Sequence, residues 1–213
     1  MKNLASMRKE YSKSSLDALS VHKSPIVQFS QWFDEAEKAE VPEPNAMNIA
    51  TVSESGKPSS RIVLLKGIEG EHFIFYTNYQ GQKGKELDLN PACALNFFWP
   101  ELERQIRIEG IAIKVEPGIS DAYFQSRPRG SQIGAWASPQ STVIANRKIL
   151  EERAKEIEIR FKDKKVLPRP HQWGGFAIEP LRIEFWQGRE SRLHDRVVYT
   201  KVNDAWKINQ LAP

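Results

Sequence analysis

Residues 93–115, CALNFFWPELERQIRIEGIAIKV, indicate the fold class more clearly than any other stretch of the chain. Polar and apolar side chains alternate along 104–115, where Ile106 and Ile108 stand against Arg107, and this alternation is typical of a strand with one buried face. The sequence Pro-Glu-Leu-Glu at 100–103 predicts a turn between this strand and the apolar run before it. Gly110 interrupts the second strand and indicates a β-bulge.

Further strands are predicted on both sides of this pair. Turn-forming residues at 54–58 and 67–71 separate three short apolar runs, which suggests an antiparallel meander. Residues 202–205, Val-Asn-Asp-Ala, predict a hairpin turn in the last apolar segment. We therefore expect seven or eight strands, mostly linked as hairpins, which lie at 93–99 and 104–115 and also at 46–52, 60–66, 72–77, 176–186 and 196–208.

Helices are predicted before and between the strands. Ser24 as N-cap and Pro25 at the first helical position begin one helix, and the prolines of VPEPN, residues 41–45, end it. Others are predicted at 80–89, 120–125, 131–137 and 143–161. Because helices and strands do not alternate regularly, we expect an α+β fold that is mainly β, an antiparallel barrel with peripheral helices.

Composition predicts one globular domain. The chain has 213 residues, of which 40% are hydrophobic and 27% charged, an ordinary balance for a protein with a sizeable core. Residues 1–23 are polar without a clear period and predict a mobile N-terminal arm, so the domain is expected over residues 24–213. No apolar run approaches the roughly 20 residues of a membrane span. The N-terminus lacks the apolar stretch of a signal peptide and the single Cys93 fits a reducing compartment, so we expect a cytoplasmic protein.

Charge and motif content narrow the class of ligand. The formal net charge of +4 suggests an anionic partner, and since no block of five like charges occurs, we favour phosphorylated small molecules over nucleic acid. No metal site is expected, because none of the four histidines falls in an HExxH or CxxC frame. The lysines of 81–85, Gly-Gln-Lys-Gly-Lys, lie at a predicted helix start, which suits an anion, although the P-loop spacing is absent.

Two polar clusters accompany predicted strands and helices. In Arg61–Lys66 the two cations flank an apolar strand on opposite faces, and taken alone they are more often strand-end charges in water. Tyr123, Arg127 and Ser131 follow one another at four-residue spacing, and their side chains together suit a phosphate group. Pro128 interrupts this helix, and routine helix capping is the simpler interpretation.

Two further clusters lie near the ends of the chain. Residues 186–196, WQGRESRLHDR, place a flat aromatic ring beside Arg192, His194 and Arg196, which suits a planar anionic cofactor. A charged hairpin loop is the commoner meaning of such a stretch. The segment Arg8–Tyr11 carries no signal alone, because disordered tails often have this composition.

Together these clusters resemble the pyridoxine/pyridoxamine 5′-phosphate oxidase family. RIVLLK (61–66), FYTN (75–78), LERQIRIEG (102–110), SRPRGSQIGAW (126–136), FWQG (185–188) and RLHDR (192–196) occur in the order and spacing of that family. The resemblance implies an antiparallel split β-barrel that binds FMN and forms a homodimer with two sites at its interface. It also implies oxidation of pyridoxamine or pyridoxine 5′-phosphate by O2 to pyridoxal 5′-phosphate in vitamin B6 metabolism, with hydrogen peroxide and, from the amine, ammonia as further products.

The resemblance also implies roles for particular residues. Arg192 and His194 resemble the catalytic pair that holds the pyridine ring over the flavin for hydride transfer, and Arg8 and Tyr11 resemble residues of a mobile lid. The residues that would bind the substrate phosphate are Lys66, Tyr123, Arg127 and Ser131. The implied FMN-binding residues are Arg61, Ile62, Val63, Leu64, Leu65, Lys66, Tyr76, Thr77, Lys83, Gln105, Gln140, Ser141, Trp186 and Arg196, of which Gln105, Gln140, Trp186 and Arg196 would come from the other subunit.

The chain departs from the family pattern at two places. Gly81-Gln82-Lys83 stands where the family often has Ser-Arg-Lys, so one phosphate-binding cation is missing. Since a charged hydrogen bond contributes about 1.5–3 kcal/mol, we expect FMN to bind about tenfold more weakly for this reason. Glu43 stands where an Asp is common before Pro44.

Two alternative functions remain open. One is a split-barrel protein that holds flavin or pyridoxal phosphate without turnover, against which the intact RLHDR and SRPR sequences argue. The other is a nucleic-acid-binding barrel, which exposes aromatic residues among basic ones along a groove. We disfavour it because Phe97, Phe98, Trp99 and Phe185 lie in apolar strand contexts.

Overall fold

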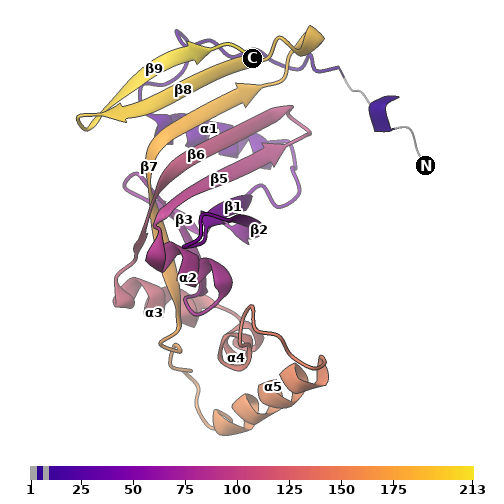
Figure 1. Ribbon diagram of the computed structural model, residues 1–213, viewed down its shortest axis with the longest axis vertical. Coiled ribbons are helices and arrows are strands. Elements are labelled where there is room, and N and C mark those ends of the chain that lie inside the picture. Colours follow the sequence, from indigo (N-terminus) through magenta and orange to yellow (C-terminus); the bar gives the residue numbers. More distant parts are fainter. Residues whose placement is uncertain (1–3, 7–9) are drawn as a thin grey trace.

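The centre of the protein is an antiparallel sheet, seen in a computed structural model that describes residues 4–6 and 10–213 (Figure 1). The sheet has nine strands. Seven follow the order β2-β1-β5-β6-β7-β4-β3, and β8 and β9 add a hairpin beside β7. The strands are β1 (Ala46–Val52), β2 (Pro58–Leu64), β3 (Gly67–Glu69), β4 (His72–Asn78), β5 (Ala92–Trp99), β6 (Arg104–Lys114), β7 (Trp173–Gln187), β8 (Asp195–Val202) and β9 (Ala205–Leu211).

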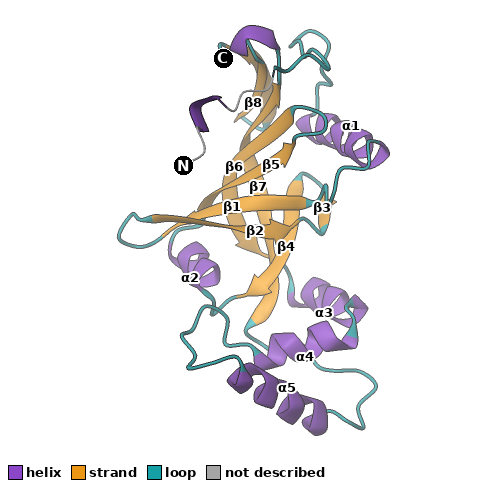
Figure 2. Ribbon diagram, turned by 90° about the vertical axis from the view of Figure 1, so that its right-hand side faces the viewer, coloured by secondary structure: helices purple, strands orange, loops and turns teal. Residues whose placement is uncertain are grey.

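The helices lie around the sheet, as predicted (Figure 2). Helix α1 begins at the expected cap, where the Ser24 side chain accepts a hydrogen bond from the backbone N–H of Val27. None of the described helices is long and apolar enough to cross a membrane. The helices are α1 (Pro25–Lys38), α2 (Gln82–Leu89), α3 (Pro117–Ser126), α4 (Arg129–Ala137) and α5 (Lys148–Arg160), with short 3₁₀ turns η1 (Leu4–Ser6) and η2 (Glu190–Arg192).

Strand β7 divides the sheet into two halves. One of its edges pairs with β6 over most of its length, whereas the other pairs with β4 through residues 173–178 and with β8 through residues 182–187. The register between β6 and β7 shifts at Glu109 and Gly110, which confirms the predicted bulge. A side chain on Gly110 would come within 2.3 Å of the Glu179 carbonyl oxygen, so only glycine fits there. The outcome is the split antiparallel barrel that the sequence predicts.

One face of the sheet is apolar and packs against α1. Phe29 is 1% exposed, and its ring lies 5.0 Å from Phe73 and 5.2 Å from Phe97 between centroids, edge to face in both cases. Trp32 packs in the same way on Phe185 at 5.1 Å. A second, smaller core joins α3, α4 and α5 to the start of β7 and contains Phe124, Ile133, Phe161, Leu167 and Trp173.

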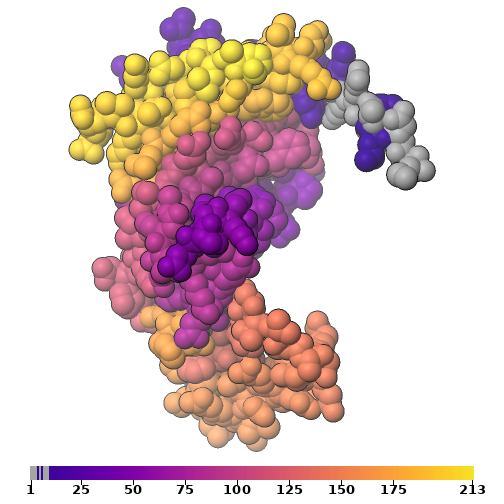
Figure 3. All heavy atoms as spheres, viewed as in Figure 1, coloured from indigo at the N-terminus to yellow at the C-terminus, as the bar shows by residue number. Residues whose placement is uncertain are grey.

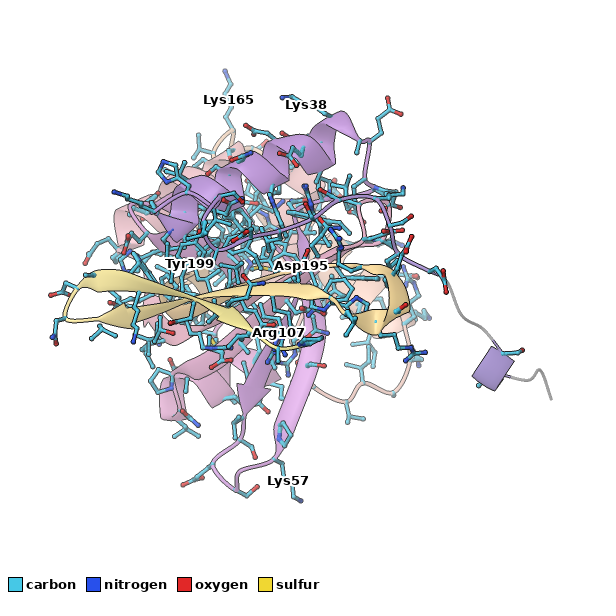
Figure 4. The ribbon with its side chains drawn as sticks, turned by 90° about the horizontal axis from the view of Figure 1, so that it is seen from above. Lys38, Lys57, Arg107, Lys165, Asp195 and Tyr199 are labelled. Atoms are coloured by element: carbon cyan, nitrogen blue, oxygen red, sulfur yellow. The ribbon has the colours of Figure 1, made fainter. Side chains whose placement is uncertain are left out.

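The opposite face of the sheet carries polar side chains. It is turned toward the viewer in Figure 3, with α1 behind the sheet in the same view of Figure 1. Arg107 on β6 stands opposite Glu184 on β7 on this face, while Tyr199 on β8 points to the α1 side (Figure 4). Apolar residues are exposed on the polar face as well, among them Ile62 at 65% and Phe98 at 51%. No other part of the described chain covers these two side chains.

Residues 10–23 lie against the domain. The Glu103 carboxylate accepts the backbone N–H groups of Ser12 and Lys13 at 2.8 and 3.0 Å. The backbone N–H of Leu16 donates to the Asp195 carboxylate at 2.9 Å, and the Leu16 side chain is buried in the main core. These contacts attach the described part of the arm to the ends of β6 and β8, and the mobility expected for residues 1–23 stays a prediction.

Several boundaries differ from the prediction by a few residues, and three of the differences have a clear cause. Residues 67–69 form β3 by pairing with β4, where a turn is predicted, and this short strand brings the total to nine. Helix α5 begins at Lys148 rather than at Val143, because Val143 is 97% exposed and packs on no apolar surface. Strand β7 begins at Trp173 rather than at Phe176, since pairing with β4 extends it.

Replacing Phe29 with alanine tests the packing of α1 on the sheet. Phe29→Ala should lower the free energy of unfolding by about 3–5 kcal/mol, because it leaves a cavity among buried rings. Urea denaturation at fixed protein concentration measures this change. Val27→Ala, at a position on the same helix that is 46% exposed, is the matched control and should cost less than about 0.5 kcal/mol. Equal losses in the two variants would contradict the assigned core.

Candidate active site

Arg61 lies beside a buried carboxylate. Its guanidinium donates to Thr51 Oγ1 and Ser59 Oγ, both at 2.5 Å, and lies 3.3 Å from Glu86 Oε2. Glu86 also accepts hydrogen bonds from the Thr51 hydroxyl and, at 2.9 Å, from Gln82 Nε2. Burial favours protonation of Glu86, but the hydrogen bonds from Thr51, Gln82 and Ser59 and the charge of Arg61 outweigh it and lower the pKa of Glu86. Glu86 is therefore an anion held next to Arg61.

Lys83 is a buried cation with neutral partners. Its Nζ donates to Thr77 Oγ1 and to Gln140 Oε1, each at 3.1 Å. Burial, assisted by the nearby charge of Arg61, lowers the pKa of Lys83. Within residues 4–6 and 10–213, no carboxylate forms an ion pair with Lys83. Glu86 acts on Lys83 only at a distance, and a buried ammonium group without a direct ion pair suits an anionic ligand.

Arg127 packs against a set of stacked rings. The Tyr76 ring lies 3.8 Å from that of Tyr123 and 5.5 Å from that of Trp173, nearly parallel to both. The Arg127 guanidinium lies 4.5 Å from the Trp173 centroid, and burial lowers the pKa of Arg127. Its Nη1 atom is buried and has no hydrogen-bond partner in the described part of the chain. Since an unpaired buried donor is costly, this atom indicates an acceptor supplied by a ligand.

A row of three side chains lies at the other end of β7. The register pairs Gln105 with Trp186 and Trp186 with Arg196, so these residues share the polar face across β6, β7 and β8. Arg196 is fixed by Glu184, which accepts from Nε and contacts Nη2, both at 2.8 Å. Glu184 is 1% exposed, and burial favours its protonated form, but its hydrogen bonds with Arg196 and Arg182 and the charges of Arg196 and Arg107 together outweigh burial and lower its pKa. The row is therefore held by buried charge pairs.

The loop after β7 brings Tyr11 and His194 to the same Trp186 ring. The Trp186 centroid lies 4.6 Å from that of His194 and 5.9 Å from that of Tyr11. A side chain on Gly188 would lie 2.7 Å from the Tyr11 ring, so this approach requires glycine. Burial and then the charge of Arg192 lower the pKa of His194, which makes it a neutral imidazole near pH 7. Arg192 is exposed and has a left-handed backbone with a φ of 62°.

These residues form two groups that one chain keeps apart. We call Arg61, Lys83, Tyr123 and Arg127 the basic group, and Tyr11, Trp186, His194 and Arg196 the ring group. Trp173, which supports the basic group, and Trp186 stand near opposite ends of β7. At about 3.3 Å per residue they are about 40 Å apart along the strand. Figure 1 shows β7 running from the region of α3 to the β8–β9 hairpin. A single chain therefore does not place both groups around one small ligand.

The other predicted residues are distributed as follows. Along β2, Ile62 points away from Arg61, as strand alternation predicts, and beyond it Leu65 is buried while Lys66 is exposed. Val63 and Leu64 are half-buried. Ser131 is exposed in the first turn of α4, and Ser141 is exposed with a left-handed φ of 65°. Arg8 lies outside the described residues. Among the residues that the structure describes, no group of three or more His, Cys, Asp or Glu side chains is placed to hold a metal ion.

Gln140 lies elsewhere than the family resemblance implies. The resemblance places it on the other subunit, apart from Lys83. In this chain Gln140 Oε1 accepts from Lys83 Nζ and also, at 3.2 Å, from Thr77 Oγ1. The reason is that the turn after α4 places Gln140 beside the start of α2, within contact of Gly81. Gln140 therefore joins the basic group of its own chain.

Sequence patterns did not indicate three residues that support these groups. Trp173 supports Arg127, Glu86 binds Arg61 and Glu184 fixes Arg196. The aromatic residue before two glycines at 173–175 is a signal that would have found Trp173. Glu86 and Glu184 leave no such signal, because a buried carboxylate and a solvated one look alike in a sequence.

Comparison with known proteins agrees with this architecture. The family model described as pyridoxamine 5′-phosphate oxidase matches residues 33–161, and the one described as the pyridoxine 5′-phosphate oxidase C-terminal dimerisation region matches residues 173–213. The chain belongs to the pyridoxamine 5′-phosphate oxidase family. It is 55% identical over 216 residues, with 100% of both chains covered, to the pyridoxine/pyridoxamine 5′-phosphate oxidase of Burkholderia mallei (strain SAVP1). Identity and coverage are the same for the enzyme of Burkholderia pseudomallei (strain K96243).

Two solved structures are similar to the chain. PhzG from Burkholderia lata 383, in complex with tetrahydrophenazine-1-carboxylic acid, is 30% identical and has a TM-score of 0.89, covering 96% of this chain and 100% of its own. A pyridoxamine 5′-phosphate oxidase-related FMN binding protein from Nostoc punctiforme PCC 73102 has a TM-score of 0.72 at 15% identity, over 91% of this chain and 100% of its own. The second likeness shows the split-barrel fold alone.

Lys83→Met tests whether Lys83 is placed for a ligand rather than for stability. The apolar side chain removes a buried charge that forms no direct ion pair. The free energy of unfolding of the ligand-free variant should therefore equal that of the unaltered protein or exceed it by up to about 2 kcal/mol. Urea denaturation in phosphate-free buffer measures it. Lys85→Met, at an exposed position of the same helix, is the control. A loss of more than about 1 kcal/mol in Lys83→Met alone would show that Lys83 serves the fold.

Proposed function

We propose that the chain is an FMN-dependent oxidase that converts pyridoxamine 5′-phosphate and pyridoxine 5′-phosphate to pyridoxal 5′-phosphate. Dioxygen is the acceptor and hydrogen peroxide the reduced product, and the amine substrate also takes up water and releases ammonia. Relatives that are 55% identical over their whole length carry the name of this activity. This degree of identity supports the proposal, and the side chains of the two groups give it a physical basis.

The observation that carries the proposal is a pair of cations, the buried Lys83 and the half-buried Arg127, that form no ion pair with a carboxylate in the described part of the chain. Lys83 has only neutral partners, and Arg127 has a buried Nη1 atom with no partner in the described chain. They lie against different neighbours, Lys83 beside Thr77 and Arg127 against Trp173. Two separate cationic positions match a cofactor and a substrate that each carry one phosphate.

Arg61 and Lys83 of the basic group, together with their neighbours, fit the phosphate of FMN. Lys83 and Arg61 supply charge, and Thr77 and Gln140 supply a hydroxyl and an amide within 3.2 Å of one another. The residues of the ring group fit its flat ring system, because Trp186 offers an aromatic face and Gln105 an amide in the same row. We propose that Tyr123, Arg127, Ser131 and Lys66 bind the substrate phosphate.

We further propose that the active enzyme is a homodimer in which the basic group of one chain meets the ring group of the other. The separation of about 40 Å along β7 prevents the groups from meeting within one chain. The C-terminal dimerisation region spans residues 173–213, which include β7, β8 and β9 and hence most of the ring group. The polar face with exposed Phe98 is the surface on which a second copy would complete the site.

The protein part of the chemistry is to bind and orient. The chemistry that FMN supplies when bound is a two-electron oxidation with transfer of the electrons to dioxygen. Arg192 and His194 would hold the pyridine ring of the substrate in one orientation beside bound FMN, which lowers the barrier because fewer orientations remain to be lost in the reaction. His194 is a neutral imidazole near pH 7 because burial and Arg192 lower its pKa, so it serves as a hydrogen-bonding group rather than a cation.

A second candidate comes from the likeness to PhzG, which was solved with a tricyclic carboxylic acid bound. Arg127 can pair with a carboxylate as well as with a phosphate. The chain would then oxidise a reduced aromatic carboxylate with the same cofactor. We favour the phosphorylated substrate, because the relatives with the oxidase name are 55% identical and PhzG is 30% identical.

Arg192→Ala separates substrate orientation from cofactor binding. The variant should lose at least about a hundredfold in turnover of pyridoxine 5′-phosphate in air, since it no longer holds the ring, and should keep FMN affinity within about threefold. Pyridoxal 5′-phosphate formation and flavin fluorescence measure the two effects. Unchanged turnover in the variant would refute the role of Arg192. Turnover of tetrahydrophenazine-1-carboxylic acid but not of pyridoxine 5′-phosphate by the unaltered protein would favour the second candidate.

Mixed dimers test the shared site. Arg127→Ala and Arg192→Ala chains should each be nearly inactive alone. When they are unfolded together and refolded as a mixture, half of the dimers contain one intact site of two, so roughly a quarter of wild-type activity should return. Refolding each variant separately before mixing is the control. If no activity returns although dimers re-form, both residues act within one chain.

A further inference from the structure

We propose that Glu86 weakens the binding of the flavin phosphate in this chain, because its carboxylate holds Arg61 and offsets one of the two cations available to that phosphate. The inference rests on the proposed function and concerns the affinity for the cofactor rather than the reaction. It identifies a residue that no motif of the sequence indicates.

The geometry shows that Arg61 is already occupied. Its Nη1 donates to Thr51 Oγ1 and, at 3.4 Å, to the Ser59 carbonyl oxygen, and its Nη2 donates to Ser59 Oγ and Glu86 Oε2. The Glu86 carboxylate is buried and is held in turn by Thr51, Ser59 and Gln82. A phosphate that binds Arg61 must therefore compete with a preformed ion pair.

The charges lead to the same conclusion. Arg61 and Lys83 are cations and Glu86 is an anion, so the ligand-free site has one net positive charge at this place. A phosphate monoester carries nearly two negative charges at pH 7 and is repelled by a neighbouring carboxylate. Because Glu86 is buried, solvent and salt screen this repulsion less than they would at the surface.

Gln82 determines how much of the Glu86 charge acts on the site. Its Nε2 lies 2.9 Å from Glu86 Oε1, one helical turn away on α2, and as a neutral amide it adds no positive charge, so Glu86 keeps Arg61 as its ion-pair partner. A cation at position 82 would pair with Glu86 and release Arg61 for the phosphate. Removing the charge of the Glu86 carboxylate and pairing it with a cation at position 82 should therefore both strengthen the binding of the flavin phosphate.

The test compares FMN with riboflavin, which has the same ring system and no phosphate. Flavin-free protein is titrated with each flavin, and quenching of flavin fluorescence gives the dissociation constants. Glu86→Gln should bind FMN about tenfold more tightly, which corresponds to about 1.4 kcal/mol, with riboflavin affinity unchanged. Gln82→Arg, at an exposed position, should shift FMN affinity in the same direction. Asp88→Asn removes an exposed carboxylate of the same helix that pairs with Lys114, and should change FMN affinity by less than about twofold.

The outcomes distinguish this inference from the proposed function. Tighter FMN binding by Glu86→Gln and Gln82→Arg, with riboflavin and Asp88→Asn unaffected, supports it. If the unaltered chain binds FMN and neither variant binds it more tightly, this inference alone is wrong. It is also wrong if the variants bind riboflavin more tightly to the same extent as FMN. If Glu86→Gln fails to fold by circular dichroism, Gln82→Arg decides the outcome. No flavin binding by any of the proteins overturns the proposed function and this inference together.

Discussion

Strand β7 is the constraint on which the rest of the structure depends. It pairs with β6 along one edge, and its other edge serves β4 at one end and β8 at the other. The sheet therefore opens into two halves, and Gly110 and Pro180 lie opposite each other near the point where the partner changes. The same strand carries Trp173 at one end and Trp186 near the other, so the length of β7 also sets the distance between the basic group and the ring group.

Buried charge is distributed differently in the two groups. In the ring group, Glu184 balances Arg196 and also contacts Arg182 at 3.0 Å, so these side chains are held in place before any ligand binds. In the basic group, only Arg61 has a carboxylate partner, whereas Lys83 and Arg127 have none within the described chain. The charged side chains of the ring group are thus paired in advance, whereas two cations of the basic group lack a carboxylate partner. This distribution suits an anionic ligand that contacts the basic group of one copy of the chain and the ring group of another.

Much of the fold could be predicted from local patterns. Alternation along 104–115, the turns at 100–103 and 202–205, and the cap at Ser24 predicted β6, two hairpins and α1, because each depends on neighbours in the chain. Residues 67–69 and 143–147 were assigned wrongly, since pairing with β4 and the absence of an apolar surface are properties of the assembled sheet. For the candidate site, motif order indicated which residues to consider but not which of them meet: Gln140 joins Lys83 of its own chain, and Glu86 and Glu184 were not indicated at all.

The sequence by itself determined the class of fold, the family and the chemical nature of the ligand-binding side chains, because periodicity, turn chemistry and motif order are local properties of the chain. Only the tertiary structure decided the separation of the two groups, the burial of Lys83 and of the Arg127 Nη1 atom, and the ion pair of Glu86 with Arg61. These properties depend on which residues distant in sequence share a sheet face or a helix end. Burial then changes the cost of each charge, and a linear sequence does not show it.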